Sequence, residues 1–345
     1  MALNLFSEIK IGQMRARNRL MMSPMSQNSA SDDGNATNWH MVHYGSRAVG
    51  GCGIVLMEDT AISPAGRVSS RALCLYEEHH ATSLQPVVSF CQENGAKVGI
   101  QLAHAGRKAW RDRRTADIGR VSTGTDAFAP DWGAPAALDD AGIGAIIQAF
   151  QHSAVLALRA GFDFIEIHAA HGYLLHQFLS PVSNNREDSY GVPAAGRRRL
   201  LLEVIAAVRA VWPPDKPLFC RLPAEDGHPD GLALDEVIEV AAVLGKLGVD
   251  MIDVAASNVS PECRIVTSGD MQRVSTLIRK KAGLATTTAG DPNQAQDLLD
   301  SGTLDLIAVG RPLLTNPYWL LAHADDEQRT RLWPRQYTLA MPKSA

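Results

Sequence analysis

The chain has 345 residues, of which 46% are hydrophobic, enough for one large α/β barrel or for two small domains. Its 33 basic and 37 acidic residues are interspersed and leave a net charge of -4, so nucleic acid is not an expected partner. We find no apolar signal segment, no run of about 18 apolar residues that would cross a membrane, and no disulfide or metal spacing among the five cysteines. We therefore expect a cytoplasmic protein without a bound metal.

Eight short apolar runs alternate with longer amphipathic stretches along the chain. The runs lie at 20–25, 53–57, 97–102, 162–167, 217–222, 251–255, 284–288 and 304–309. Apolar residues at helical spacing follow nearly all of them, at 39–49, 81–94, 142–160, 197–211, 234–247, 271–282 and 292–302. This alternation predicts an α/β fold, a single (β/α)8 TIM barrel over residues 1–345. A doubly wound open sheet is the alternative, disfavoured because no G-x-G-x-x-G follows the first strand.

One connection, at about residues 105–140, is too long for a simple turn and carries Trp110 and Trp132. Connections of that length are usually functional or disordered. Its two tryptophans favour a lid that folds over a ligand, and the alternative is a surface excursion.

The segment His168-Ala-Ala-His171-Gly-Tyr173 follows the fourth predicted strand. In such barrels the active site lies at the C-terminal ends of the strands. Two imidazoles there can direct N–H donors at one substrate oxygen, and a phenol carries a proton that it gives up only reluctantly. The pattern therefore suits carbonyl polarisation and protonation. A metal pair and two histidines bonded to backbone carbonyls are the alternatives.

Other strand ends carry groups that suit a flavin mononucleotide. Gln101 could read the pyrimidine ring, and Arg221 could offset the negative charge of the reduced ring. The turns after the seventh and eighth strands of barrels often hold a phosphate. The candidate ring-edge and phosphate residues are Ser23, Pro24, Met25, Ser26, Ala289, Gly290, Gly310 and Arg311. A Gly-Arg pair is also common for purely structural reasons.

Five segments resemble the old yellow enzyme family, especially its bacterial branch of FMN-dependent ene-reductases. They lie at 18–25, 39–48, 98–108, 161–191 and 306–317, and the fourth is the most specific. The resemblance implies noncovalent FMN, reduced by NADH or NADPH, and hydride transfer to an activated alkene. It also implies that His168 and His171 bind the activating oxygen of the substrate and that Tyr173 supplies the proton. The residues that match flavin-binding positions of the family are Ser23, Met25, Gln101, Arg221, Gly290, Gly310 and Arg311.

The chain departs from the family pattern around the expected substrate. Ser26 stands where the bacterial branch usually has a cysteine, and Asn28 where it has a tyrosine that touches substrate. Asp59 replaces a small uncharged residue beside the flavin; it could bind a substrate amine, act as a base, or point into a helix N-terminus. In the C-terminal extension, residues 335–337 resemble a segment that lends an arginine to the neighbouring subunit, but the arginine expected after Tyr337 is missing. We expect a homo-oligomer. The sequence does not decide whether one subunit contributes a residue to the site of another.

We therefore expect an FMN-dependent enzyme that uses NADH or NADPH to reduce the C=C bond of a carbonyl-activated small molecule. The alternative is an FMN-dependent dehydrogenase, demethylase or oxidase of specialised metabolism, with its substrate engaged by Asp59. A flavin-binding protein without turnover is the third reading, disfavoured because His168, His171 and Tyr173 are all present.

Overall fold

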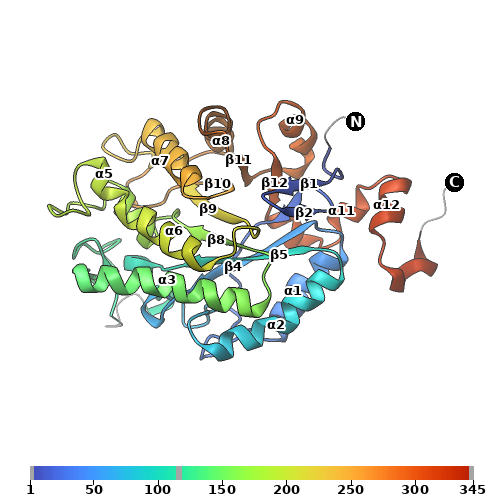
Figure 1. Cartoon of the computed structure of the whole chain (residues 1–345), viewed down its shortest axis with the longest axis horizontal. Helices are drawn as coiled ribbons and strands as arrows, with labels where there is room; N and C mark the ends of the chain where they lie inside the picture. Colours follow the sequence, from blue (N-terminus) through green and yellow to red (C-terminus); the bar gives the residue numbers. More distant parts are fainter. Residues whose placement is uncertain (1–3, 114–118, 342–345) are drawn as a thin grey trace.

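Eight parallel strands close into a barrel in the computed structural model, which describes residues 4–113 and 119–341 (Figure 1). Around the barrel the strand order is β3, β4, β5, β8, β9, β10, β11, β12 and back to β3. The strands are Leu20–Met22 (β3), Ile54–Ala61 (β4), Lys97–Ala103 (β5), Phe164–His168 (β8), Leu218–Pro223 (β9), Met251–Ala255 (β10), Ala285–Ala289 (β11) and Leu306–Val309 (β12). The predicted (β/α)8 barrel is confirmed, and the open sheet is wrong.

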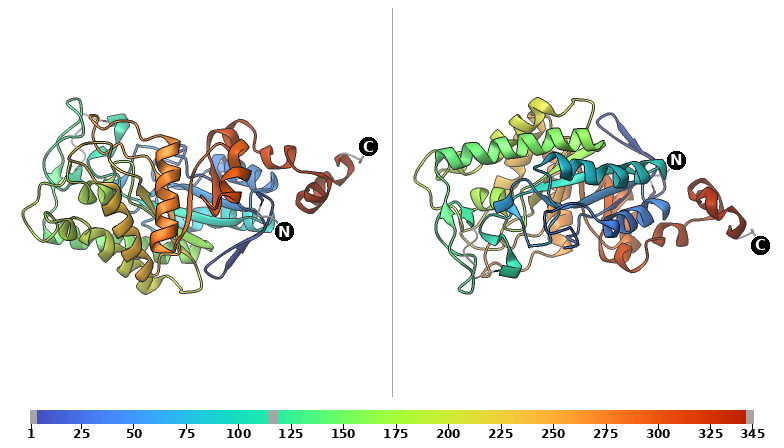
Figure 2. Two further views of the ribbon diagram at one scale, coloured as in Figure 1. Left: turned by 90° about the horizontal axis from the view of Figure 1, so that it is seen from above. Right: turned by 90° about the horizontal axis from the view of Figure 1, so that it is seen from below.

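Helices cover the outside of the barrel (Figures 1 and 2). The larger ones are Asn38–Val49 (α1), Glu78–Glu93 (α2), Asp140–Ala160 (α3), Arg199–Val211 (α6), Leu234–Lys246 (α7) and Ser268–Ala282 (α8). The shorter ones are Leu174–Leu179 (α4), Ala194–Arg197 (α5), Ala295–Asp300 (α9) and Arg311–Thr315 (α10), with 3-10 turns at Pro64–Gly66 (η1) and Pro292–Gln294 (η4). Several begin earlier than predicted because their first turn is polar. In α8, for example, Thr267 and Asp270 form a reciprocal capping box before the first apolar residue.

Helix α3 bears on the expectation that no segment crosses a membrane. By length and composition alone its 21 residues could cross a membrane, a criterion that a buried core helix also meets, although they contain no run of 18 apolar residues. Here α3 packs against α2 and α6 within the helical layer of the barrel.

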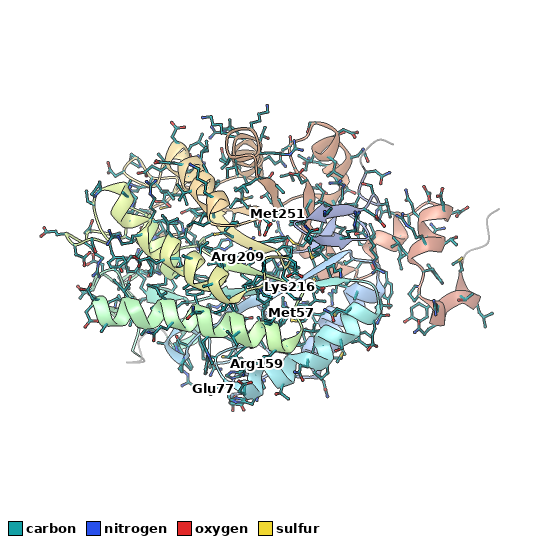
Figure 3. The ribbon with its side chains drawn as sticks, viewed as in Figure 1. Met57, Glu77, Arg159, Arg209, Lys216 and Met251 are labelled. Atoms are coloured by element: carbon teal, nitrogen blue, oxygen red, sulfur yellow. The ribbon has the colours of Figure 1, made fainter. Side chains whose placement is uncertain are left out.

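A hairpin that the sequence analysis missed closes the barrel at the N-terminal ends of its strands. Its strands, Ile9–Ile11 (β1) and Met14–Ala16 (β2), have three residues each, too short for a periodicity signal. Their buried side chains pack with the interior residues Phe164, Phe219 and Met251. Met251 is labelled near the centre of Figure 3. A ligand therefore has to approach from the C-terminal ends of the strands.

Strand β4 is longer than predicted, because it continues through Glu58, Asp59 and Thr60 to Ala61. Glu58 can stay in a buried strand because its carboxylate finds partners. The carboxylate of Glu58 accepts hydrogen bonds from the Tyr44 hydroxyl at 3.0 Å and from the Gln27 N–H at 2.6 Å. A register shift between residues 57 and 59 then places Asp59 opposite Gln101 of β5. Asp59 thus lies within the strand and not after it.

The connection at 105–140 contains short elements, which are Gly106–Lys108 (η2), Arg111–Arg113 (η3), Val121–Ser122 (β6) and Ala136–Ala137 (β7); residues 114–118 lie outside the described residues. Trp110 packs in a small apolar cluster with Val68, Ala105 and Tyr173. This contact places the start of the connection beside the predicted catalytic tyrosine. That the connection closes as a lid stays a prediction.

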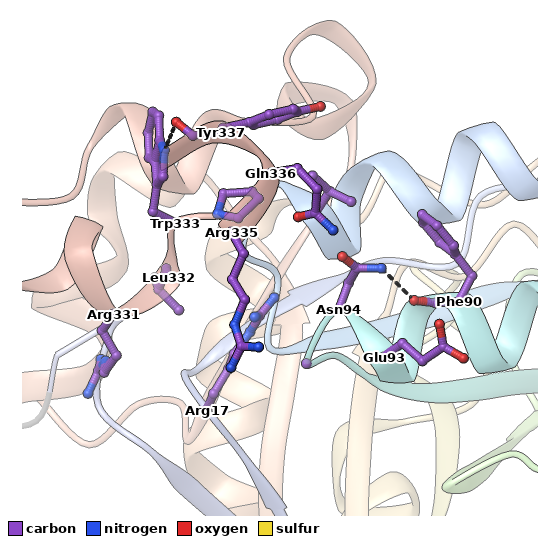
Figure 4. Close-up of a pocket in the computed structure, with 13 residues that line it drawn as sticks. Arg17, Phe90, Glu93, Asn94, Arg331, Leu332, Trp333, Arg335, Gln336 and Tyr337 are labelled. Atoms are coloured by element: carbon purple, nitrogen blue, oxygen red, sulfur yellow. Dashed lines mark hydrogen bonds between the residues drawn. The ribbon is translucent and has the colours of Figure 1, made fainter. Parts of the chain in front are cut away.

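The C-terminal extension projects from the barrel in the views of Figures 1 and 2. It consists of Trp319–Ala322 (α11), Asp326–Leu332 (α12) and Arg335–Ala340 (η5). Together with the end of α2 it lines a cavity of about 820 Å³, whose wall carries Arg17, Arg331 and Arg335 (Figure 4). Trp333 stiffens the extension by donating to the Tyr337 carbonyl at 2.7 Å. This cavity is lined by none of the predicted site residues, so its size does not identify the functional site.

Candidate active site

The strand register brings the predicted polar residues of four strands into one ring. Asp59 of β4 and Gln101 of β5 are paired, and Gln101 is paired in turn with Glu166 of β8. On the next strand pair His168 lies opposite Arg221 of β9. Because neighbouring parallel strands end at the same edge, these side chains meet at the C-terminal mouth of the barrel.

His168 and His171 form a pair of neutral imidazoles. Their nitrogens Nε2 and Nδ1 lie 3.1 Å apart, and the His168 Nδ1 accepts the Ala170 N–H at 3.2 Å. We assign the proton of His168 to Nε2 on this pattern, so it points at His171 and leaves the Nε2–H of His171 as a free donor. Burial, followed by nearby positive charges that include Arg221, holds the pKa of both imidazoles well below the ordinary value. They therefore act as hydrogen-bond donors and not as cations.

Tyr173 stands next to this pair, with its ring centroid 4.9 Å from that of His168. The backbone reaches this position through His171 and Gly172, which have φ values of 55° and 70°. At Gly172 a side chain is excluded, because a Cβ would lie 2.3 Å from the Asn258 carbonyl oxygen. Burial, followed by the field of Asp59, raises the pKa of the Tyr173 phenol well above its ordinary value. The phenol thus keeps its proton at neutral pH.

A buried polar network holds the turn that carries Tyr173. The His176 ring accepts the Gly172 N–H at 2.9 Å and lies 2.8 Å from Asp226 on its other side. Asp226 also accepts the hydroxyls of Ser180 and Ser257, at 2.5 and 3.0 Å. Both His176 and Asp226 are completely buried. The sequence analysis did not single out either residue, although His176 lies within the most specific segment.

Lys108 braces the same turn from the long connection and was also missed. Its ammonium donates to the carbonyls of His171 and Asn258, at 2.8 and 3.1 Å. Burial, followed by the charges of Arg107 and Arg111, lowers the pKa of Lys108 to about 7. The amine therefore changes charge near neutral pH, beside the imidazole pair.

Gln101 and Arg221 are held in place by two acids that the sequence analysis missed. Gln101 donates to Glu166 at 2.7 Å. The Arg221 Nε lies 3.0 Å from Asp253, as an ion pair without a well-aligned hydrogen bond. Burial raises the pKa of Glu166 to about 8 and that of Asp253 to about 6. An acid inside an otherwise apolar strand, as in FDFIEI and MIDVA, was the available signal for both.

Ser26 and Asp59 form a second pair at the mouth of the barrel. The Ser26 hydroxyl donates to Asp59 Oδ1, and the carboxyl is only 6% exposed. Burial raises the pKa of Asp59 to about 7 against the opposing hydrogen bond from Ser26, and the charge of Glu58 adds to the rise. The bonded partner of Asp59 is thus a hydroxyl and not a helix N-terminus. Asn28, nearby in sequence, has a φ of 50°, and its side-chain oxygen accepts from Ser69 at 2.6 Å and Arg111 at 3.4 Å.

The predicted phosphate side also comes together. A Cβ added to Gly310 would lie 3.4 Å from the Met25 sulfur and 4.0 Å from the Ser23 Cβ, so the ends of β3 and β12 meet. Arg311 follows with an exposed side chain. Gly290, however, donates its N–H to the Ala308 carbonyl at 3.0 Å. This N–H is therefore used within the barrel, and that Gly290 lies against the phosphate stays a prediction.

The residues at the mouth fit an FMN molecule. The Ser23 hydroxyl and the Asp59 Oδ2 are buried without a hydrogen-bond partner among the described residues. A polar edge of a flavin ring would satisfy the Ser23 hydroxyl, and Arg311 offers a cation for the phosphate. No cluster of three or more His, Cys, Asp or Glu that could hold a metal is found in residues 4–113 and 119–341.

Comparisons with known proteins show which family this chain resembles. Residues 4–328 match the NADH:flavin oxidoreductase / NADH oxidase family. An NADPH dehydrogenase of Geobacillus sp. is 42% identical over 326 residues, covering 93% of this chain and 94% of the relative. The structure of morphinone reductase has a TM-score of 0.80 at 25% identity, covering 95% of this chain and 93% of that chain. An old yellow enzyme homologue from Zymomonas mobilis shares the fold at 24% identity, with a TM-score of 0.79 and coverage of 99% of this chain and 100% of that chain.

The match spans nearly the whole chain and nearly the whole of these relatives. The chain therefore belongs to the NADH:flavin oxidoreductase / NADH oxidase family, that of the old yellow enzymes, and is an FMN-dependent oxidoreductase that uses NADH or NADPH.

Proposed function

We propose that this enzyme reduces the C=C bond of a small molecule in which a carbonyl activates the alkene. The observation that carries the proposal is the neutral imidazole pair of His168 and His171 with the protonated Tyr173 beside it. The names of the relatives, an NADPH dehydrogenase and morphinone reductase, support a reductive reaction.

Each of the three side chains has a role in this proposal. The Nε2–H groups of His168 and His171 bind the carbonyl oxygen of the substrate. This oxygen takes the place of the His171 Nδ1 as the acceptor for the His168 Nε2–H. Neutral donors polarise this oxygen without transferring a proton to it. Tyr173 holds a proton that it can deliver to the carbon next to the carbonyl.

FMN, when bound, supplies the two-electron chemistry. The residues that we propose to hold it are Ser23, Pro24, Met25, Ser26, Asp59, Gln101, Arg221, Ala289, Gly290, Gly310 and Arg311. Asn28 and Asp59 would face the substrate together with the imidazole pair.

Anaerobic mixing of the holoprotein with NADH or NADPH, and then with cyclohexenone, tests the proposal. We expect the flavin absorbance to bleach in the first step and to return in the second. If the absorbance bleaches but does not return, the enzyme reduces an acceptor other than cyclohexenone. If the absorbance does not bleach, the proposal is wrong.

Asp59 favours a second candidate function, the oxidation of a substrate. With a pKa near 7, this carboxyl could accept a proton as an amine or alcohol is oxidised. Bleaching of the oxidised holoprotein by such a substrate alone would favour this direction.

A further inference from the structure

We propose that Asp59 is a specificity-determining residue whose free oxygen, Oδ2, binds a neutral N–H or O–H group of the substrate. The inference rests on the proposed reduction of a carbonyl-activated alkene. It adds that the preferred substrates carry a hydrogen-bond donor besides the oxygen held by the imidazole pair.

The two oxygens of Asp59 differ in their surroundings. Oδ1 accepts the Ser26 hydroxyl, whereas Oδ2 is buried and has no partner among the described residues. A buried acceptor without a donor is unfavourable, because it has lost its hydrogen bonds to water. A ligand that brings a donor to Oδ2 restores such a hydrogen bond, and a ligand with an apolar group there does not.

Oδ2 belongs to the ligand side of the barrel. Ser26, which binds the other oxygen, directly follows the residues that meet Gly310 at the mouth. The negative charge of Asp59 helps to raise the pKa of the Tyr173 phenol. The positive charge of Arg111, in the long connection, lowers the pKa of Asp59 in turn. Glu58 is the adjacent strand residue, and its carboxylate is occupied by Tyr44 and Gln27.

The surrounding charges favour a neutral donor over a cation. The positive charges of Arg111 and Arg221 both lower the pKa of the Tyr173 phenol, whose own pKa is raised by Asp59. The Lys108 nitrogen lies 5.7 Å from the centre of the Tyr173 ring. A cationic substrate group would meet these like charges as well as the single carboxylate. An amide or amine N–H without charge, or a hydroxyl, pairs with Oδ2 without that repulsion.

Matched substrates that differ only in the donor test this inference. We would compare the 4-, 5- and 6-hydroxycyclohexenones with their methoxy counterparts by kcat/KM in the holoenzyme. For at least one position we expect the hydroxy compound to be favoured by about 10-fold or more, the range of a hydrogen bond to a charged group.

Two variants assign this preference to Asp59. In Asp59→Ala the hydroxy-to-methoxy ratio should fall to about one, whatever the variant does to cyclohexenone itself. Ser26→Ala is the matched control, because it removes the hydroxyl but keeps the carboxyl, and there the ratio should stay well above one. A ratio near one at every position in the wild type, or one unchanged in Asp59→Ala, would overturn the inference.

The outcomes separate this inference from the proposed function. If cyclohexenone is reduced but no hydroxy preference exists, the function stands and the inference is wrong. If no compound is reduced, the proposed function is wrong. Calorimetry with the oxidised holoprotein then gives the ratio of Kd values for the same hydroxy and methoxy pairs, which still tests whether Oδ2 binds the hydroxyl. Loss of FMN in Asp59→Ala without any hydroxy preference in the wild type would assign Oδ2 to the flavin and also overturn the inference.

Discussion

Replacement of Asp59 by asparagine should stabilise the protein at alkaline pH and have little effect in acid. Burial raises the pKa of Asp59 from 3.8 to about 7, so the folded protein holds a proton that the unfolded chain releases. This proton stabilises the fold below about pH 4, and the contribution is lost as the pH rises to about 7. An amide of the same shape has no proton to lose and can still accept the Ser26 hydroxyl.

The size of the effect follows from the shift in pKa. About three units at ~1.4 kcal/mol each give about 4 kcal/mol in favour of Asp59→Asn above about pH 8. For 345 residues at ~2.1 cal/mol/K per residue, the entropy of unfolding is about 0.7 kcal/mol/K. The Tm should therefore rise by about 6 °C at pH 8, with a difference near zero at pH 4.

Calorimetric scans at both pH values, with saturating FMN and a fixed scan rate, measure this difference. Asp32→Asn is the control, because the Asp32 side chain is 97% exposed and its loss should change the Tm little at either pH. An equal Tm shift of Asp59→Asn at pH 4 and pH 8, or a lower Tm at pH 8, would refute the reasoning. Asp59 would then be ionised in the folded protein and stabilised by its neighbours.

Three further substitutions test the other parts of the site. Tyr173→Phe should leave flavin reduction by NADH or NADPH intact but slow the step with weakly activated alkenes by about 10²–10⁴-fold in stopped-flow experiments; equal slowing of both steps would argue against a proton donor. Asp226→Ala should lower the free energy of unfolding by about 3–5 kcal/mol, because it leaves the His176 ring and two hydroxyls without their acceptor, whereas the exposed Asp230→Asn should change it little. Arg311→Ala should weaken FMN binding by about 10–150-fold in a fluorescence titration, and an unchanged Kd would remove Arg311 from the phosphate site; Arg15→Ala, at an exposed position of β2 at the opposite end of the barrel, is its control.

The barrel was predictable because most of its strands are built on apolar runs that are buried on both faces. The same reasoning failed where polar residues continue a buried strand. The apolar run that predicted strand β4 ends at Met57, because Glu58 and Asp59 are polar, whereas the strand continues to Ala61. Only the fold reveals that Tyr44 and Gln27 satisfy Glu58, because these partners lie elsewhere in the chain.

The candidate catalytic residues could be proposed from the sequence because they are neighbours in it, whereas the residues that contact them are not. His168, His171 and Tyr173 lie within one turn, but Lys108 and Asp226 reach that turn from other loops. Their role depends on three-dimensional contacts that no spacing rule encodes.

Ser26 and Asp59 connect the sequence to the specificity of the site. Each was noticed separately, as a departure from the family pattern, and neither by itself explains the other. The structure joins them by a hydrogen bond, which occupies one carboxyl oxygen and leaves the second without a partner among the described residues. A thiol at position 26 would be a weaker donor to this carboxyl than a hydroxyl. The two departures are therefore linked in space, because the hydroxyl and the carboxyl form one polar contact at the mouth of the barrel.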